Sequence, residues 1–173
     1  YQGVISEGRG IEMLLRVFSN LKNNHIVFMG FGELADKVKI YSENYNNIHF
    51  HKPVKQKDLP LYSSSADVGV SLLENSCLNH YYCLPNKIWE YLIGSTPILV
   101  CDYPEMKKVI DTFDCGWVVP PIEVEILKAI KELSLDEINN KRKNVQSMHG
   151  KFGWEFEEKT LLKMYENLGF HNR

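Results

Sequence analysis

The sequence has little of what marks a membrane protein, a nucleic-acid binder or a disulfide-rich domain. No apolar run approaches the roughly 20 residues that span a bilayer, and no signal peptide is recognisable. A net charge of −2 and a pI near 6.3 argue against a general nucleic-acid binder, which would carry a basic excess. No CxxC spacing occurs, so we expect reduced thiols in a cytoplasmic protein at Cys77, Cys83, Cys101 and Cys115.

Several catalytic signatures are missing as well. The chain has no Walker A loop, nucleophile elbow or HExxH motif. His49 and His51 alternate on a predicted strand and share a face, but two histidines without a third ligand make a poor metal site. We therefore expect no metal and no cofactor apart from a co-substrate.

What remains is an ordinary globular composition over 173 residues, with 44% hydrophobic and 24% charged content. This length fits one domain with a real core, residues 1–173. Residues 1–5 already read as the end of a strand without a lead-in. We therefore expect an excised piece of a longer protein.

Short apolar runs alternate with amphipathic stretches, which is typical of a repeating βα parallel sheet. The run at residues 67–73 is apolar almost throughout and predicts a central strand. The pattern predicts an α/β, Rossmann-like, doubly wound parallel sheet of about six strands with extra C-terminal helices. The strands are expected at residues 4–5, 25–29, 48–50, 67–73, 98–101 and 116–119. Helices are expected at residues 10–21, 33–42, 57–63, 86–93, 104–110, 124–133, 135–149 and 154–168.

The last predicted helix has a broad apolar side, made of Phe156, Leu161, Leu162, Met164, Tyr165 and Leu168. It could pack on its own domain, which is the simpler interpretation. The alternative is packing against a second domain outside this chain.

In doubly wound sheets, ligands bind beyond the carboxyl ends of the strands. The loops that matter are therefore residues 6–10, 30–33, 51–55 and 74–85. In the first, Arg9 and two glycines precede a helix, which suits a phosphate, although a plain glycine-rich turn has the same look. Gly30 and Gly32 follow the second strand and favour a tight turn, with close approach to a ligand as the alternative.

The segment 84–97 is the most informative one. Lys87 and Glu90 lie one turn apart on a short helix after Pro85. The cation suits a phosphate and the carboxylate suits two ribose hydroxyls. The alternatives are a surface lysine and a solvated acid, paired with each other at i and i+3. His80, in a polar loop, is a candidate sugar contact or simply exposed.

Taken together, these motifs resemble the C-terminal, nucleotide-sugar-binding domain of a GT-B glycosyltransferase of the family-4 group (glycosyl transferases group 1), which are retaining enzymes. The resemblance covers nearly the whole chain. The blocks ADVGVSLLE and LPNKIWEYL, in that order, are its most specific part. Its other carriers are Gly3 with Arg9-Gly10, Gly30-Phe31-Gly32, Tyr62, Gly94, Pro97 and Trp154-Glu155.

The resemblance implies roles for individual residues. Arg9 and Lys87 would carry the catalytic charge by stabilising the leaving diphosphate. The acid matching Glu90 holds the ribose, and residues 53–54 contact the base. The full expected donor-nucleotide set is Gly3, Arg9, Gly10, Gly30, Gly32, Val54, Cys83, Leu84 and Glu90.

Two departures from the family pattern matter. The family commonly has an arginine where this chain has Val4, and an acid where it has Tyr82. The first removes one cation for the diphosphate, and the second removes a group that positions the donor sugar. Glu74, His80 or Tyr82 would then supply the sugar contacts.

The resulting expectation is a hexosyltransferase-type enzyme that acts in polysaccharide synthesis, with this fragment alone inactive. Its partners would be the nucleotide sugar and a missing N-terminal acceptor domain, with any membrane contact at the inner face made by that domain. A GT-B nucleotide-sugar epimerase is one alternative. A non-catalytic Rossmann-like interaction module is another.

Overall fold

The computed structural model describes residues 1–150 and 153–169, and it is an α/β domain with six parallel strands. The strands form two sheets of three, in the orders β1-β2-β3 and β4-β5-β6. Their bounds are Gln2–Val4 (β1), Ile26–Phe31 (β2), Ile48–His51 (β3), Gly69–Ser71 (β4), Ile98–Cys101 (β5) and Gly116–Val119 (β6). The predicted fold class is confirmed, although β4 is shorter than the apolar run at residues 67–73.

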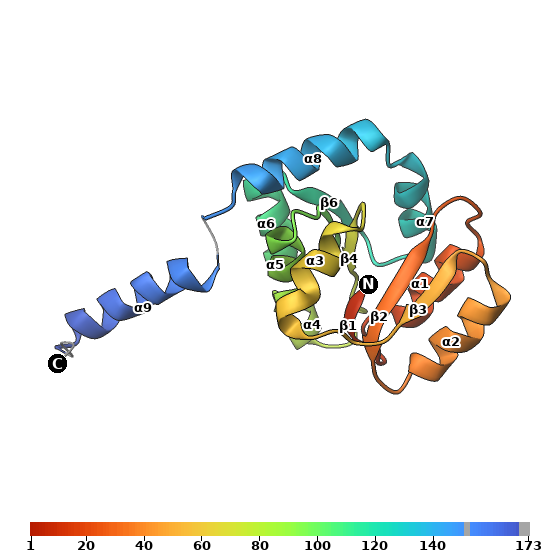
Figure 1. Ribbon diagram of the computed structural model, residues 1–173, viewed down its shortest axis with the longest axis horizontal. Coiled ribbons are helices and arrows are strands. Elements are labelled where there is room, and N and C mark those ends of the chain that lie inside the picture. The colour runs from red at the N-terminus through yellow and green to blue at the C-terminus, as the bar shows by residue number, and fades with distance from the viewer. Residues whose placement is uncertain (151–152, 170–173) are drawn as a thin grey trace.

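The two sheets meet at β1 and β4, which lie next to each other in the middle of the molecule (Figure 1). No ladder joins them; the hydroxyl of Tyr91 lies between them instead. It accepts a hydrogen bond from the backbone N–H of Gln2 at 2.9 Å and donates to the carbonyl of Val70 at 3.5 Å. The Tyr91 ring covers Gly69, where a Cβ would collide with it. One side chain thus bridges the gap, and β4 is central to the six strands even though it pairs only with β5.

All eight helical segments that the sequence predicts are present in the described residues, with one further helix, α4, between them. Helices α1 and α2 pack on the first sheet, and α1 also contacts α7 (Figure 1). Helix α8 begins with a capping box between Ser134 and Glu137. The bounds are Ile11–Ser19 (α1), Ala35–Asn44 (α2), Leu59–Ser64 (α3), Leu78–Tyr82 (α4), Asn86–Ile93 (α5), Pro104–Phe113 (α6), Glu123–Glu132 (α7), Leu135–Ser147 (α8) and Trp154–Asn167 (α9), with a 3₁₀ turn at Gln56–Asp58.

Helix α4 was not predicted, because residues 74–83 read as a polar loop. Its five residues are too few for a periodic apolar pattern to show. The ring of Tyr81 packs on that of Tyr103, with centroids 5.3 Å apart, and this contact holds α4 against the body. None of the helices in the described part of the chain is long and apolar enough to cross a membrane.

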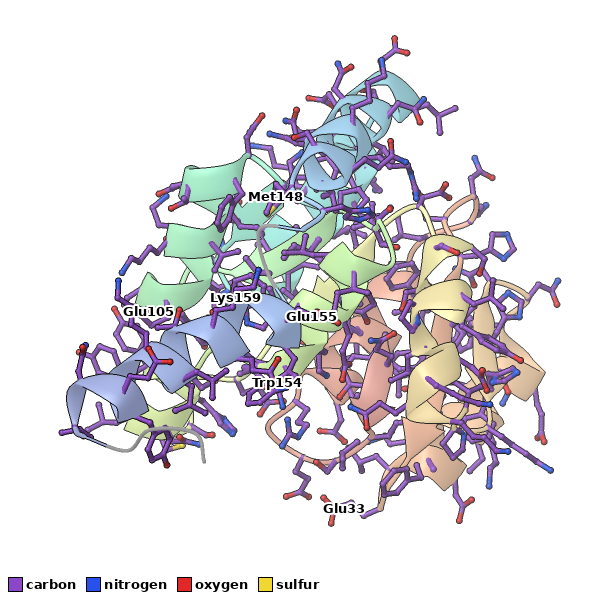
Figure 2. All side chains as sticks on the ribbon, turned by 60° about the vertical axis from the view of Figure 1, so that its left-hand side comes forward. Glu33, Glu105, Met148, Trp154, Glu155 and Lys159 are labelled. Atoms are coloured by element: carbon purple, nitrogen blue, oxygen red, sulfur yellow. The ribbon has the colours of Figure 1, made fainter. Side chains whose placement is uncertain are left out.

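Helix α9 leaves the body and extends away from it (Figure 1). Figure 2, turned so that α9 comes forward, shows Trp154 and Lys159 pointing to opposite sides of the helix. The simpler prediction, that this helix packs on its own domain, is therefore wrong. The side chain of Phe156 lies outside the described part, but the other large apolar residues are exposed: Trp154, Leu161, Leu162, Met164, Tyr165 and Leu168.

The Tyr91 bridge gives a stability prediction. Tyr91→Phe would leave the buried N–H of Gln2 without its acceptor, and we expect the free energy of unfolding to fall by about 1–3 kcal/mol. Urea denaturation measures this loss. Tyr45→Phe is the matched control, because the Tyr45 side chain is exposed just after α2. Equal unfolding free energies for the two variants would contradict the bridge.

Candidate functional site

The carboxyl ends of β1, β2 and β4 bring three of the predicted loops together. The N–H of Glu74 donates to the carbonyl of Gly8 at 3.0 Å, and the N–H of Glu7 donates to the Glu33 carboxylate at 3.0 Å. Glu33 lies at the lower edge of the molecule in Figure 2. The loops after the first, second and fourth strands therefore form one continuous edge, as the sequence predicts.

Glycines at this edge allow strand backbones to approach closely. Gly10 has φ 71°, and a Cβ there would collide with the carbonyl of Leu72. Gly30 lies inside β2, where a Cβ would collide with the carbonyl of Gly3, so the predicted tight turn at Gly30 is wrong. At Gly32, just beyond the strand, a Cβ would collide with the carbonyl of Ile5. A side chain at any of these three glycines would therefore collide with protein backbone.

Gly3 is different, because it is exposed and adjoins Lys87. A Cβ on Gly3 would lie 3.7 Å from the Lys87 Nζ. That ammonium stands over the Tyr1 ring, 3.8 Å from its centroid. The open backbone of β1 and the amine therefore line the same small region.

Lys87 is only 8% exposed, so the alternative of a helix-surface lysine is wrong. Burial lowers the pKa of Lys87 from 10.5 to about 7, helped by the nearby charge of Arg9 and opposed by Glu90. At neutral pH the Lys87 side chain is therefore close to its pKa, and a large fraction of it is uncharged. An anion placed beside it would favour the protonated form.

Glu90 is half-buried on the same helix. Its Oε2 accepts a hydrogen bond from the Gln2 side-chain amide at 2.9 Å. Among the described residues no ion pair joins it to Lys87, so the alternative of an i, i+3 pair is wrong. No sequence pattern pointed to Gln2, the one polar side chain of β1.

The predicted sugar contacts diverge. His80 Nδ1 lies 3.1 Å from the Glu74 carbonyl and 2.9 Å from the Ser76 hydroxyl, and its ring packs on Gly8. A carbonyl oxygen only accepts, so the Glu74 contact is a hydrogen bond in the tautomer that is protonated at Nδ1. Tyr82 is 58% exposed, with the edge of its ring near Tyr81. The structure thus brings His80, but not Tyr82, against the first loop.

The remaining predicted nucleotide contacts are partly buried. Leu84 is half-buried just before α5 and packs on the core. Cys83 is also half-buried; burial raises the pKa of its thiol, which donates to the carbonyl of His80 at 3.4 Å. Val54 is half-buried beyond β3. A raised pKa makes the Cys83 thiol a poor nucleophile.

The histidines of β3 do not gather a metal site in residues 1–150 and 153–169, where no three potential His, Cys, Asp or Glu ligands come together. His49 Nε2 lies 3.0 Å from His25 Nδ1. His51 instead contacts the carbonyl of Lys52 at 2.6 Å and the ring of Tyr62. His49 and His51 do share one face of β3.

Solved structures with this fold are numerous and distant in sequence. Sucrose-phosphate synthase from Thermosynechococcus elongatus matches with a TM-score of 0.74 and 18% identity, over 96% of this chain and 45% of its own. Anabaena Alr3699/HepE, solved in complex with UDP, matches with a TM-score of 0.73 and 13% identity, over 96% of this chain and 48% of its own. WaaG, a glycosyltransferase involved in lipopolysaccharide biosynthesis, matches with a TM-score of 0.65 and 15% identity, over 92% of this chain and 45% of its own.

These likenesses establish the fold, and this chain spans less than half the length of each of the three proteins. No curated protein sequence matches it. The family model described as glycosyl transferases group 1 matches residues 1–136, which is most of the chain. With the fold that the resemblance implied, this match shows that the chain belongs to the glycosyl transferases group 1 family.

Proposed function

We propose that this chain is the donor-binding domain of a retaining, hexosyltransferase-type glycosyltransferase. The enzyme would transfer a sugar from a nucleoside-diphosphate sugar to a saccharide or lipid-linked acceptor. The observation that carries this is the placing of Lys87 and Glu90 on one side of α5, beside the open backbone of Gly3. Family membership and the UDP bound in the HepE structure support it.

Charge complementarity assigns the diphosphate to Lys87 and Arg9. The positive charge of Arg9 also lowers the pKa of Lys87, so the two cations oppose each other in the free domain. A diphosphate between them would relieve this repulsion, and the negative charge that develops as the sugar leaves would be stabilised further. We propose no metal or other cofactor, since these two cations and backbone N–H groups meet the charge.

The remaining contacts to the donor are assigned to residues near the carboxyl ends of the strands. Glu90 would accept hydrogen bonds from the ribose hydroxyls, and the backbone at Val54 would contact the base. Cys83 and Leu84 would approach the diphosphate. In place of the acid that the family has at Tyr82, His80 and Glu74 would contact the donor sugar, since both lie against Gly8.

A second domain would complete the enzyme. Because the chain covers under half of the similar structures, we propose that an N-terminal domain provides the acceptor site, and that this chain alone turns over little or no substrate. The exposed apolar side of α9 would pack against that domain. The proposed setting is cytoplasmic polysaccharide synthesis, with any membrane contact made by the other domain.

The role of the Glu90 carboxylate is tested by titrating the chain with UDP, GDP and ADP and detecting binding by saturation-transfer NMR. We expect one diphosphate to bind with its ribose protons in contact with the protein. In Glu90→Gln the affinity should fall about tenfold or more, because charge-assisted hydrogen bonds are lost. Glu43→Gln, an exposed acid of α2, should bind like the wild type. Unchanged affinity in Glu90→Gln would contradict the assignment.

The buried lysine predicts a pH dependence. With a pKa of about 7 in the free protein, Lys87 must take up a proton to bind an anion above that pH. Affinity for UDP-glucose, whose phosphates keep a constant charge in this range, should be greatest below pH 7. It should fall by up to about tenfold per pH unit above it.

The lysine's own variants supply the controls for that profile. Lys87→Arg keeps its charge at every accessible pH and should flatten the curve at high affinity. Lys87→Met has no charge at this position and should bind UDP-glucose weakly at every pH. A wild-type profile that is flat between about pH 6 and 9, measured by calorimetry, would contradict the role of this amine.

A further inference from the structure

Gln2 is a buried polar residue on β1, with only 2% of its surface exposed. Its backbone N–H donates to Tyr91, and its side-chain amide reaches two more partners. The amide N–H donates to Glu90 Oε2 at 2.9 Å, and the amide oxygen accepts from the Ser63 hydroxyl at 2.7 Å. Two consecutive residues of α5 therefore hold this one glutamine.

The chemistry of the partners fixes which way the amide points. An ionised carboxylate only accepts hydrogen bonds, so the NH₂ of Gln2 must face Glu90. The amide oxygen then faces Ser63, whose hydroxyl must donate. Ser63 is itself anchored, because the Thr96 hydroxyl donates to its carbonyl at 2.7 Å. The side-chain hydrogen bonds thus run in one direction, from Ser63 through Gln2 to Glu90, while Thr96 holds the Ser63 backbone.

This arrangement acts on the orientation of the carboxylate. A glutamate side chain has several rotatable bonds, and holding it still before a ligand arrives reduces the entropy lost on binding. The bond from Gln2 occupies one of about four lone-pair positions on the carboxylate, which leaves room for two hydroxyl donors. An apolar residue at position 2 would fill the same buried space without holding Glu90.

We infer that Gln2 is a positioning residue, which holds the Glu90 carboxylate in the orientation that receives the two ribose hydroxyls of a nucleoside diphosphate, with Ser63 fixing the Gln2 amide. This inference rests on the proposed function, since it deepens the role of Glu90. If Gln2 had only a structural role, its hydrogen bonds would connect β1 to α3 and α5 without affecting how ribose is bound. The two roles differ in how they affect ligands with and without ribose hydroxyls.

The test is calorimetry on the chain with UDP and with 2′,3′-dideoxy-UDP. The same comparison is made for GDP and for ADP, each with its 2′,3′-dideoxy form. The ratio of the two affinities measures recognition of the hydroxyls. Gln2→Met has the same length without the hydrogen bonds, and we expect it to reduce the ratio about tenfold while leaving dideoxy binding unchanged. A structural role would weaken both ligands equally, and that result, or an unchanged ratio, would overturn the inference.

Ser63→Ala keeps Gln2 in place and guards against a Gln2→Met chain that does not fold. It should reduce the ratio less than Gln2→Met, because the amide remains but is no longer fixed. Ser64→Ala is the matched control, since the exposed Ser64 hydroxyl bonds only to the carbonyl of Leu61 among its described contacts. An unchanged ratio in Ser63→Ala would overturn the part assigned to Ser63.

The outcomes separate this inference from the proposed function. A wild-type chain that prefers the ribonucleotide, and a Gln2→Met chain that prefers it equally, would overturn the inference alone. A wild-type chain that binds both forms equally would overturn the ribose role of Glu90 and the inference with it. Absence of binding to all three diphosphates at millimolar concentration would count against both.

Discussion

The placement of α5 across the junction of β1 and β4 is the constraint on which the rest of the structure depends. Tyr91 supplies the hydrogen bonds that a continuous ladder would supply, so the helix is fixed to both half-sheets. In a helix, residues three and four apart lie on one side. Lys87 lies four residues before Tyr91 and three before Glu90, so anchoring Tyr91 also places the amine and the carboxylate. The junction of the fold and the candidate site are therefore one piece of structure.

Much of this arrangement could be predicted from the sequence, because the signals are local. Apolar runs between amphipathic stretches predicted all six strands, and the short helix after Pro85 is present as expected. Close contacts between distant segments could not be predicted in this way. Gly30 looked like a turn because its requirement for a bare backbone comes from Gly3, on another strand. A periodic pattern records that a face is buried and does not name the neighbour.

The partners of individual side chains were the other limit. An i, i+3 spacing suggested that Lys87 and Glu90 pair, yet the carboxylate bonds to Gln2, which is 88 residues away in the chain. The sequence predicted α9 as a helix with an apolar side, and the helix is present. Its described apolar side chains are exposed on its own domain, and no pattern within the helix could show that. Long-range pairing of this kind depends on topology, which local periodicity determines only in outline.

The buried Lys87 also bears on why the domain would bind an anion at all. Burying an ammonium without a carboxylate in ion-pair range is unfavourable, and here the described partner is the face of the Tyr1 ring. The repulsion from Arg9 adds to that penalty. A bound diphosphate would remove both unfavourable terms, and a ligand that binds only the native state stabilises it in proportion to its affinity. The same charges that weaken the free domain thus favour the liganded one, so stability and donor affinity are coupled through one side chain.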